Sequence, residues 1–389
     1  MINRHCSLAG FNSKLGTALV LVLAVSSLAR AAPPIVQIVH SFNGSDGRSP
    51  STEAPLVRGP LGSVFGVTQV GGATDEGAMF FVDPLDGFHL IRSFSTGGER
   101  GVYPNSLAFS DDGTLFGTTA FGGAYGCGTL FRVGWTGSAG TVHSFDCVKG
   151  NIPSGRIVVR DGSVIGSTGS GGSTSGGSIY RVSSTGEITV LYEVAQHFSN
   201  EAGMYWGLRS APNGDLIGAT MGWDIGDFHG VVLRVDAAGV TTILHTFGGG
   251  ADGSRPTSAP VVAADGTIYG TTFQGGLQDS GTVYKISPQG DYSVLYSFTP
   301  DQAGPFSGLV LGHNGRLYGT TVYGGQTGNG TVFELKTNGQ LRVVYEFNGV
   351  NNFGYPQGGL VETTPGTFYG TTGGGGDFQL GTIYKLKVR

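Results

Sequence analysis

The sequence repeats one short pattern seven times, and this repetition constrains the possible folds more than any other feature. In each copy a glycine within an apolar run is followed two residues later by a threonine, as in Tyr318-Gly319-Thr320-Thr321. The glycines of the seven copies are Gly66, Gly117, Gly166, Gly218, Gly270, Gly319 and Gly370. They recur about every 50 residues, a period typical of repeat architectures such as propellers. Such even spacing leaves no room for a separate inserted domain.

Each repeat divides into four strand-like runs. In the sixth repeat these runs are residues 307–311, 316–321, 330–335 and 340–347, which we label strands a to d. Asn314-Gly315 separates a from b and Asn338-Gly339 separates c from d; such pairs favour two-residue hairpin turns because both positions accept positive φ. The 72 glycines and the low charged fraction of 13% also suit short strands joined by tight turns. We expect an all-β fold of antiparallel four-stranded units.

The order of the strands favours a closed ring over an open array. The first strand-like run, residues 35–42, matches strand d, whereas the last repeat stops after strand c at residues 381–386. A ring that adds its N-terminal strand to its last blade explains this permutation and removes the open edges. The alternative, a linear solenoid, gains nothing from it. We therefore predict a seven-bladed β-propeller over residues 32–389, whose last blade combines strands within 357–389 with strand 35–42.

The first 31 residues have the features of a secretory signal peptide. Arg4 and Lys14 form a positively charged start, a short apolar run follows at residues 15–28, and Ala29-Arg30-Ala31 supplies a small-x-small cleavage pattern. The alternative is an uncleaved N-terminal anchor, although the apolar run is short for a membrane span. We expect the mature chain to be exported to the periplasm or the extracellular space, without a membrane span and as a monomer.

Charge and cysteine content narrow the partners and the redox environment. The net charge is -5 and no Lys/Arg-rich run is present, so we expect no nucleic-acid partner. Two cysteines remain after the signal, Cys127 at the start of a strand c and Cys147 after the next strand d. If the hairpin between them is centred on Gly137, they face each other and can form a disulfide in an oxidising compartment. The alternative is a pair of buried free thiols.

The repeat resembles the tandem GloVer-type repeats of exported bacterial proteins. The resemblance rests on the Gly-Leu-Val, Leu/Tyr-Tyr-Gly-Thr-Thr, Gly-Gly, Gly-Thr-Val-Phe and Leu-Tyr-Ser-Phe patterns, and residues 307–347 and 258–298 carry them most closely. It covers about residues 35–389. It implies an exported repeat protein, often with a C-terminal anchor; the sequence ends at Lys385-Leu386-Lys387-Val388-Arg389, and we expect no surface attachment through such an anchor. The resemblance brings no catalytic residues with it.

One repeat departs from the others in the loops that we expect on a shared face. In a propeller the b–c and d–a loops emerge on the same side, here named the top face, where ligand sites usually gather. The fourth repeat has a longer b–c loop, residues 221–229, and an aromatic-rich d–a loop, residues 196–206. Its aromatic residues predict a stacking platform for a sugar, with polar neighbours that bind hydroxyls. The alternative is a repeat that has drifted without acquiring a function.

The residues assigned to this site fall into three groups. The ligand-binding candidates are Asn200, Glu201, Trp206, Trp223, Asp224 and Asp227, with Arg48, Arg100 and Arg255 from neighbouring d–a loops to pair with an anionic group. The catalytic candidates are His197 or His229 as a base and Tyr205 as an acid. We therefore expect an extracellular glycan or other extracellular ligand, and the alternatives are a polysaccharide lyase that β-eliminates a uronate polymer, a glycosidase, or a protein–protein scaffold.

No cofactor is expected from the sequence. The repeated Gly-Gly pairs of the b–c loops are followed by neither a helix start nor Lys-Ser/Thr, so they indicate backbone geometry rather than a phosphate cradle. His197, His229 and a carboxylate lack a diagnostic metal spacing, and we predict no metal site. Asp46-Gly47 and Asp252-Gly253 could bind calcium, although ordinary turn chemistry accounts for them as well.

Overall fold

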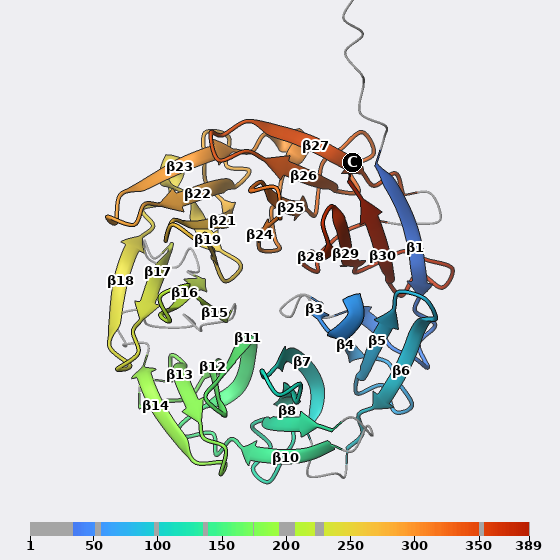
Figure 1. The fold of residues 1–389 in the computed structure, drawn as a ribbon, viewed down its shortest axis with the longest axis vertical. Coiled ribbons are helices and arrows are strands. Elements are labelled where there is room, and N and C mark those ends of the chain that lie inside the picture. Colours follow the sequence, from blue (N-terminus) through green and yellow to red (C-terminus); the bar gives the residue numbers. More distant parts are fainter. Residues whose placement is uncertain are drawn as a thin grey trace, which may run out of the picture. The chain divides into compact units, whose positions relative to one another are not determined.

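The protein forms a ring of seven small antiparallel β-sheets, shown in the computed structural model of Figure 1. The structure describes residues 34–50, 56–96, 101–134, 139–173, 175–193, 207–221, 229–349 and 354–388, all within one compact unit that spans Pro33–Arg389. Each sheet is one blade, and the prediction of a seven-bladed propeller is confirmed. Among the described residues no helix has the length and apolarity needed to cross a membrane.

The blades follow one another along the chain. Blade one contains β2 (Arg48–Pro50), β3 (Val57–Arg58), β4 (Val64–Val70), β5 (Ala78–Asp83) and β6 (Gly87–Ser93). Blade two contains β7 (Val102–Phe109), β8 (Leu115–Phe121), β9 (Thr129–Val133) and β10 (Ala139–Ser144). Blade three contains β11 (Asn151–Arg160), β12 (Ser163–Ser170), β13 (Ser178–Val182) and β14 (Ile188–Glu193). Blade four contains β15 (Leu208–Ser210), β16 (Leu216–Met221), β17 (Gly230–Val235) and β18 (Thr241–Thr246).

The remaining three blades complete the ring. Blade five contains β19 (Ser254–Pro256), β20 (Val261–Val262), β21 (Ile268–Gln274), β22 (Thr282–Ile286) and β23 (Tyr292–Ser297). Blade six contains β24 (Val310–Leu311), β25 (Leu317–Thr321), β26 (Thr331–Leu335) and β27 (Leu341–Glu346). Blade seven contains β28 (Val361–Thr364), β29 (Thr367–Thr372), β30 (Thr382–Lys387) and β1 (Ile35–Ser41). Short 3₁₀ turns occur at η1 (Pro60–Gly62), η3 (Gly250–Asp252) and η4 (Pro300–Gln302). In blades one and five strand a is split into two short pieces that both pair with strand b.

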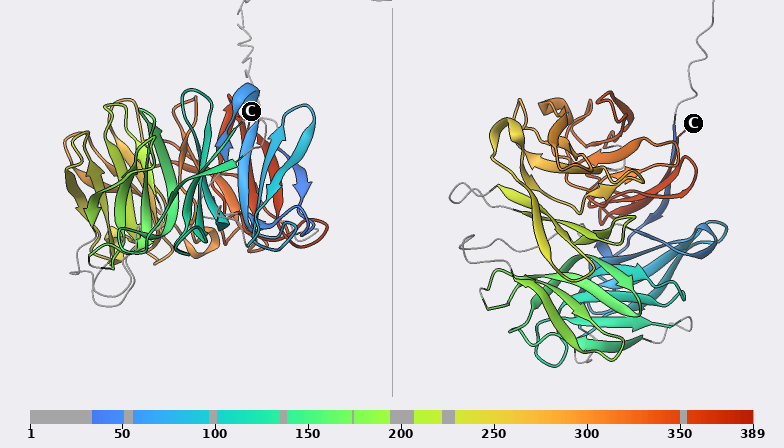
Figure 2. Two further views of the ribbon diagram at one scale, coloured as in Figure 1. Left: turned by 90° about the horizontal axis from the view of Figure 1, so that it is seen from below. Right: turned by 60° about the vertical axis from the view of Figure 1, so that its left-hand side comes forward.

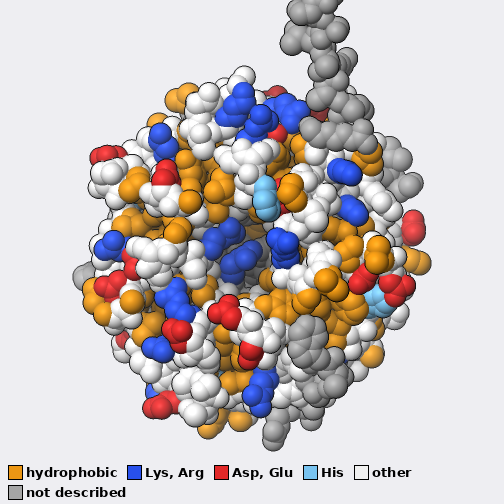
Figure 3. Space-filling model, in the orientation of Figure 1, with side chains coloured by type: hydrophobic (Ala, Val, Ile, Leu, Met, Phe, Trp, Pro, Cys, Tyr) orange, Lys and Arg blue, Asp and Glu red, His pale blue; other side chains and the backbone are white. Residues whose placement is uncertain are grey.

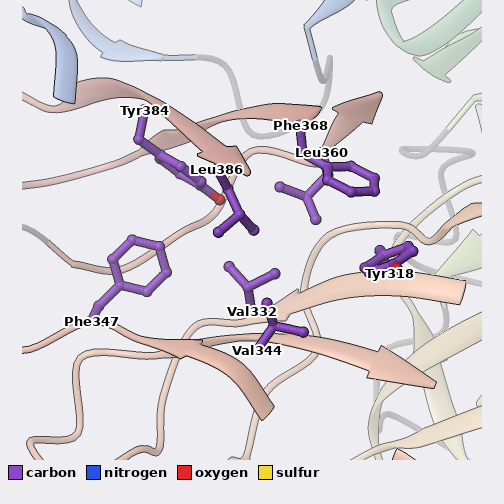
Figure 4. Packing of buried hydrophobic residues seen from close by; sticks show 8 residues of the cluster. All are labelled: Tyr318, Val332, Val344, Phe347, Leu360, Phe368, Tyr384 and Leu386. Carbon is purple, nitrogen blue, oxygen red and sulfur yellow. The ribbon is translucent and has the colours of Figure 1, made fainter. Parts of the chain in front are cut away.

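The N-terminal strand closes the ring, as the strand order predicts. β1 pairs antiparallel with β30, with Ile38 opposite Tyr384, so that blade seven is built from both parts of the chain. Figure 2 shows the blades edge-on, side by side around the ring. Val36 of β1 packs against the apolar cluster between blades six and seven, which Figure 4 shows in close-up around Phe347, Tyr384 and Leu386. Ring closure therefore rests on strand pairing and on burial together.

Aromatic rings hold neighbouring blades together at six of the seven boundaries in the part of the chain that the structure describes. The phenylalanine that follows strand d lies edge-on or tilted against the aromatic ring of strand c in the following blade, with ring centroids 4.9 to 5.5 Å apart. The pairs are Phe42–Phe80, Phe94–Phe131, Phe145–Tyr180, Phe247–Tyr284, Phe298–Phe333 and Phe347–Tyr384. Each buried ring contributes about 1.5–3 kcal/mol relative to an exposed one. The repeated aromatic positions of the sequence are thus the interblade core.

The glycine of the repeat is required because the strand-c ring covers it. A Cβ placed on Gly319 of β25 would come within 2.5 Å of the Phe333 ring on β26, which lies opposite it in the sheet. Other blades repeat this arrangement, for example Gly66 beneath Phe80. The aromatic ring of strand c can pack against the sheet only where the opposite residue of strand b has no side chain.

Strand d carries a β-bulge at the same place in every blade. One residue of strand d is skipped in the pairing with strand c, and it packs into the cluster shared with the neighbouring blade. The skipped residues are Val39, Ile91, Val142, Leu191, Leu244, Leu295 and Val344. Bulges bend the strand and increase its twist. They therefore let the outer strand follow the curvature of the blade while it keeps an apolar residue in the interface.

The bulge changes the register that the sequence predicts for blade two. Gly140 lies opposite Arg132, so the hairpin is not centred on Gly137 as predicted. The register then shifts between Thr141 and His143 because Val142 bulges. Cys127 and Cys147 are brought together beyond this shift and form a disulfide with their Cα atoms 5.4 Å apart. The predicted pairing of the cysteines is confirmed, although the predicted register is wrong.

Candidate functional site

A repeated main-chain contact positions the residues of the top face. At several of the described blade boundaries, the second residue of strand a, just after the d–a loop, donates its N–H to a carbonyl that precedes strand c of the previous blade. Examples are Tyr103 to Glu76 at 2.9 Å and Ile152 to Cys127 at 3.2 Å. Tyr103 and Ile152 adopt positive φ, of 58° and 55°. Because this strained backbone recurs from blade to blade, it belongs to the repeat geometry and does not by itself mark a functional site.

His229 occupies this acceptor position at the boundary between blades four and five. Its carbonyl oxygen accepts a hydrogen bond of 2.9 Å from the N–H of Arg255. Its imidazole Nδ1 lies 3.0 Å from the hydroxyl oxygen of Ser254, a buried residue at the start of β19. The imidazole also packs against the backbone at Gly249, where a Cβ would meet Nε2 at 2.6 Å. His229 is therefore held by blade five although it belongs to blade four.

Arg255 lies beside His229 and is partly covered by blade five. Its φ is 59°, its guanidinium lies 5.8 Å from the centroid of the Phe273 ring, and its Nη1 lies 3.3 Å from the side-chain oxygen of Gln274. Phe273 and Gln274 are at the end of β21. The structure thus brings two predicted residues, His229 and Arg255, together at one blade boundary. We name the set of His229, Ser254, Arg255, Phe273 and Gln274 the blade-four/five cluster.

Three members of this cluster, Ser254, Phe273 and Gln274, were not predicted from the sequence. Ser254 directly precedes Arg255, and Phe273-Gln274 directly precedes a Gly-Gly pair. The sequence could therefore have placed all three residues at loops of the top face. No feature of residue type distinguished them, because serine, phenylalanine and glutamine are common beside turns. Their significance comes from the contact between two blades, which a repeat pattern alone does not show.

Arg48 is positioned differently from Arg255. It lies in β2 of blade one and forms a two-point ion pair with Asp75, with Nε–Oδ1 of 2.9 Å and Nη2–Oδ2 of 2.5 Å. Asp75 also accepts the N–H of Gly71. The hydrogen bonds from Arg48 and then Gly71 hold the pKa of the Asp75 carboxyl below its usual range. Arg48 therefore stabilises a loop within its own blade, three blades away from the blade-four/five cluster along the ring.

The other predicted site residues lie outside the described residues. They are Arg100, His197, Asn200, Glu201, Tyr205, Trp206, Trp223, Asp224 and Asp227. Their roles stay predictions. Within the part of the chain that the structure describes, no three His, Cys, Asp or Glu side chains gather as a group that could hold a metal ion.

Histidines of strand d pack against the next blade. His40 stacks on Phe88 at 3.6 Å between centroids, and its Nε2 lies 3.0 Å from Asp46. His245 repeats this arrangement with Tyr292 and Asp252. Burial lowers the pKa of His40 although the Asp46 carboxylate opposes this shift. Asp46 and Asp252 also accept main-chain N–H groups of their own turns, from Asn43 and Gly248, so both carboxylates hold turns and histidines in place.

Clefts open between neighbouring blades on the face opposite the top face, and two of them are the larger ones. One, of about 320 Å³, lies between the a–b turns of blades four and five and is lined by Asn213, Arg234 and Asp265. The other, of about 430 Å³, lies between blades one and two and is mainly apolar, with Phe65, Phe81 and Phe109 in its wall. These clefts lie at turns that the sequence analysis did not consider as sites.

Comparisons with solved structures agree on the fold. The extracellular domain of a protein from B. thetaiotaomicron assigned to a hybrid two-component system matches with a TM-score of 0.58 and 13% identity, over 92% of this chain and 43% of that one. A protein from Bacteroides uniformis assigned as a 6-phosphogluconolactonase matches with a TM-score of 0.53 and 15% identity, over 79% of this chain and 88% of that one. A puromycin hydrolase matches with a TM-score of 0.56 and 13% identity, over 88% and 53%. At these identities the likeness concerns the fold alone.

Comparison with protein families gives a more specific result. No curated protein matches the chain. The family model described as the Gloeobacter/Verrucomicrobia repeat matches residues 25–223 and 206–389, which together include every blade. The seven repeats that the sequence shows all lie within these matched residues. The chain therefore belongs to the family of the Gloeobacter/Verrucomicrobia repeat.

Proposed function

We propose that the protein is exported and binds an extracellular glycan at the top face of blades four and five. The observation that carries this proposal is the blade-four/five cluster, in which an imidazole, a hydroxyl, a guanidinium, an amide and an aromatic ring meet at one blade boundary. Sugars are bound by such combinations of aromatic faces and fixed polar groups. The cluster adjoins in sequence the aromatic-rich b–c loop of blade four, which ends at His229.

Two further observations support the setting. The Cys127–Cys147 disulfide supports export, because structural disulfides persist mainly in oxidising compartments. The cluster rests on main-chain contacts between two blades, so its polar groups are held by a rigid scaffold. A pre-organised site loses less conformational entropy when it binds a ligand.

The test is a glycan-array screen followed by calorimetric titration of any sugar that binds. We expect Trp223→Ala and Arg255→Ala to weaken binding at least about tenfold, because Arg255 belongs to the cluster and Trp223 is predicted from the sequence to stack on the sugar. Arg48→Ala serves as the matched control, since it removes a top-face arginine that is committed to Asp75. Equal binding by all three variants, or no glycan bound by the wild type, would contradict the proposal.

The catalytic alternative can be separated from binding with the same material. If His229, His197 and Tyr205 act as acid and base on a uronate polymer, β-elimination produces an unsaturated uronate with ultraviolet absorbance. This absorbance would appear with the wild type and be lost in His229→Ala and His197→Ala. Binding without this product favours a binding protein over a lyase.

A further inference from the structure

The inner strands of the blades carry an excess of positive charge. The strands a that surround the centre of the ring in Figure 1 hold six arginines in the described residues, namely Arg48, Arg58, Arg156, Arg160, Arg209 and Arg255. Among the described residues of these strands, the acidic residue is Glu362 of β28. Figure 3 shows Lys and Arg side chains gathered around the central opening on the face that it displays. This charge contrasts with the net charge of -5 of the whole chain.

Two of these arginines are brought together by direct contact between two inner strands. Arg156 of β11 forms an isolated parallel bridge with Gly207, which directly precedes β15. Gly207 has a φ of 77°, and a Cβ at this position would meet the backbone of Arg156. Only glycine allows this approach without strain. Arg209 lies two residues further along, at the centre of β15.

The neighbours of the two arginines fill the interblade clusters. Ile157 and Leu208 are buried to 3% and 0% exposure in the clusters on either side of blade three. Because successive side chains of a strand point to opposite faces, Arg156 points away from the cluster of Ile157 and towards blade four, and Arg209 points away from the cluster of Leu208. Both side chains remain half-buried on the innermost strands. They therefore lie where the inner strands border the central channel.

Neither guanidinium has a partner among the described residues. No hydrogen bond or ion pair joins the side chain of Arg156 or Arg209 to them, and Nε of Arg209 is fully buried without a hydrogen-bond acceptor. Burial lowers the pKa of Arg156 to about 10. Burial, and then the charge of Arg156, lower the pKa of Arg209 to about 9. Both groups still carry a proton at neutral pH, so two like charges stand close together without a counter-ion among the described residues.

We propose that Arg156 and Arg209 form an anion-binding site in the central channel, which takes a carboxylate, sulfate or phosphate group. Guanidinium forks match the paired oxygens of such groups, and charge-assisted hydrogen bonds are among the strongest in proteins. An anion between the two arginines supplies the acceptors that the buried nitrogen lacks and screens the repulsion between the charges. The site is distinct from the blade-four/five cluster and does not depend on glycan binding there.

The experiment measures anion binding to the full mature chain by calorimetry and by thermal unfolding. Sulfate, inorganic phosphate, acetate and glucuronate are added separately, with sodium chloride at equal ionic strength as the reference. We expect oxyanions to raise the unfolding temperature above that in chloride alone. Arg156→Gln and Arg209→Gln are expected to weaken oxyanion binding at least about tenfold. The matched control is Arg181→Gln, which removes an exposed arginine of β13 in blade three.

The stability of Arg156→Gln and Arg209→Gln without oxyanion separates a loss of anion binding from a folding defect. Without added oxyanion, Arg209→Gln is expected to be at least as stable as the wild type, because one of two like charges is removed. Preference for acetate and glucuronate over sulfate and phosphate would identify a carboxylate ligand, and the reverse preference a sulfate or phosphate ligand. The proposal is overturned if chloride matches every oxyanion, or if both channel variants bind oxyanions as tightly as Arg181→Gln does.

Discussion

The main-chain N–H of Arg255 donates a hydrogen bond of 2.9 Å to the carbonyl oxygen of His229, and this bond joins the first turn of blade five to strand c of blade four. Equivalent bonds recur at other blade boundaries, where the residues involved share no side-chain chemistry. The ring therefore fixes the backbone of its top face and leaves the side chains there free to differ between blades. This separation allows one boundary to acquire a binding function without a change in the fold.

The contact between Gly319 and the aromatic ring of Phe333 can be tested by adding one methyl group to the glycine. Gly319→Ala places a Cβ against the Phe333 ring, so we expect the free energy of unfolding to fall by about 1–3 kcal/mol through overpacking. Gly140→Ala is the matched control, since a Cβ on this strand residue meets nothing within 4 Å. Chemical denaturation measures both variants. Equal free energies of unfolding for the two variants would show that the Phe333 side chain moves aside without loss of stability.

A buried hydroxyl without a partner should be dispensable. The hydroxyl of Tyr284 is buried and has no hydrogen-bond partner among the described residues, whereas that of Tyr292 donates to the carbonyl of Asp252 at 2.5 Å. We expect Tyr284→Phe to leave stability unchanged or to raise it by up to about 1 kcal/mol, and Tyr292→Phe to lower it by about 1 kcal/mol. Thermal unfolding of the two variants measures the contrast. A marked loss in Tyr284→Phe would indicate a buried acceptor at this hydroxyl.

The disulfide of blade two should contribute to stability. Its cysteines are 20 residues apart, and loops of this size give about 2–4 kcal/mol when they are closed by a disulfide. We expect Cys147→Ala to lower the free energy of unfolding by about this amount, and a reducing agent to have the same effect on the wild type. The variant itself provides the control, because the reductant should then have no further effect. A response of the variant to the reductant would point to another cause.

Acid should weaken blade six through Glu334. This carboxyl is 3% exposed and accepts hydrogen bonds from Arg316, Arg342 and Tyr318 at 2.5, 3.0 and 3.1 Å. Burial raises the pKa of Glu334, but the hydrogen bond and charge of Arg342, followed by Tyr318 and Arg316, outweigh burial and leave the pKa below its usual value. A carboxyl whose pKa is lowered on folding stabilises the fold above its unfolded pKa, near 4.3, and loses that effect as pH falls through the folded pKa.

This behaviour gives a measurable pH profile. Between pH 7 and pH 3 we expect the unfolding temperature of the wild type to fall more steeply than that of Glu334→Gln, which is already less stable at pH 7 by about 1.5–3 kcal/mol. Glu187→Gln, at an exposed turn position, should keep the wild-type profile. Parallel profiles for wild type and Glu334→Gln would assign the acid response to other carboxyls.

The number of blades, the strand order and the closure by residues 35–42 could be predicted because they follow from counting repeats. The bulge at Val142 could not be predicted from the sequence, because a bulged valine leaves the apolar pattern of its strand unchanged. Arg156 and Arg209 could have been recognised by comparing the repeats. The aligned inner-strand positions of blade two hold the small residues Ser106 and Ala108. A charged residue at such a position is costly unless something binds it. His197 and Trp223 lie outside the described residues, so the predicted site stays partly untested.

The pairing of β1 with β30 also sets the order of assembly. β1 is synthesised before all other strands of the ring and its partner after them, so the last sheet cannot form until β30 has been synthesised. A contact that spans nearly the whole chain slows folding, because the intervening segment must be ordered first. A chain cut short before residue 382 leaves β1 with an open hydrogen-bonding edge, which is prone to aggregation and accessible to proteases. The closing strand thus distinguishes chains that contain β30 from chains that lack it.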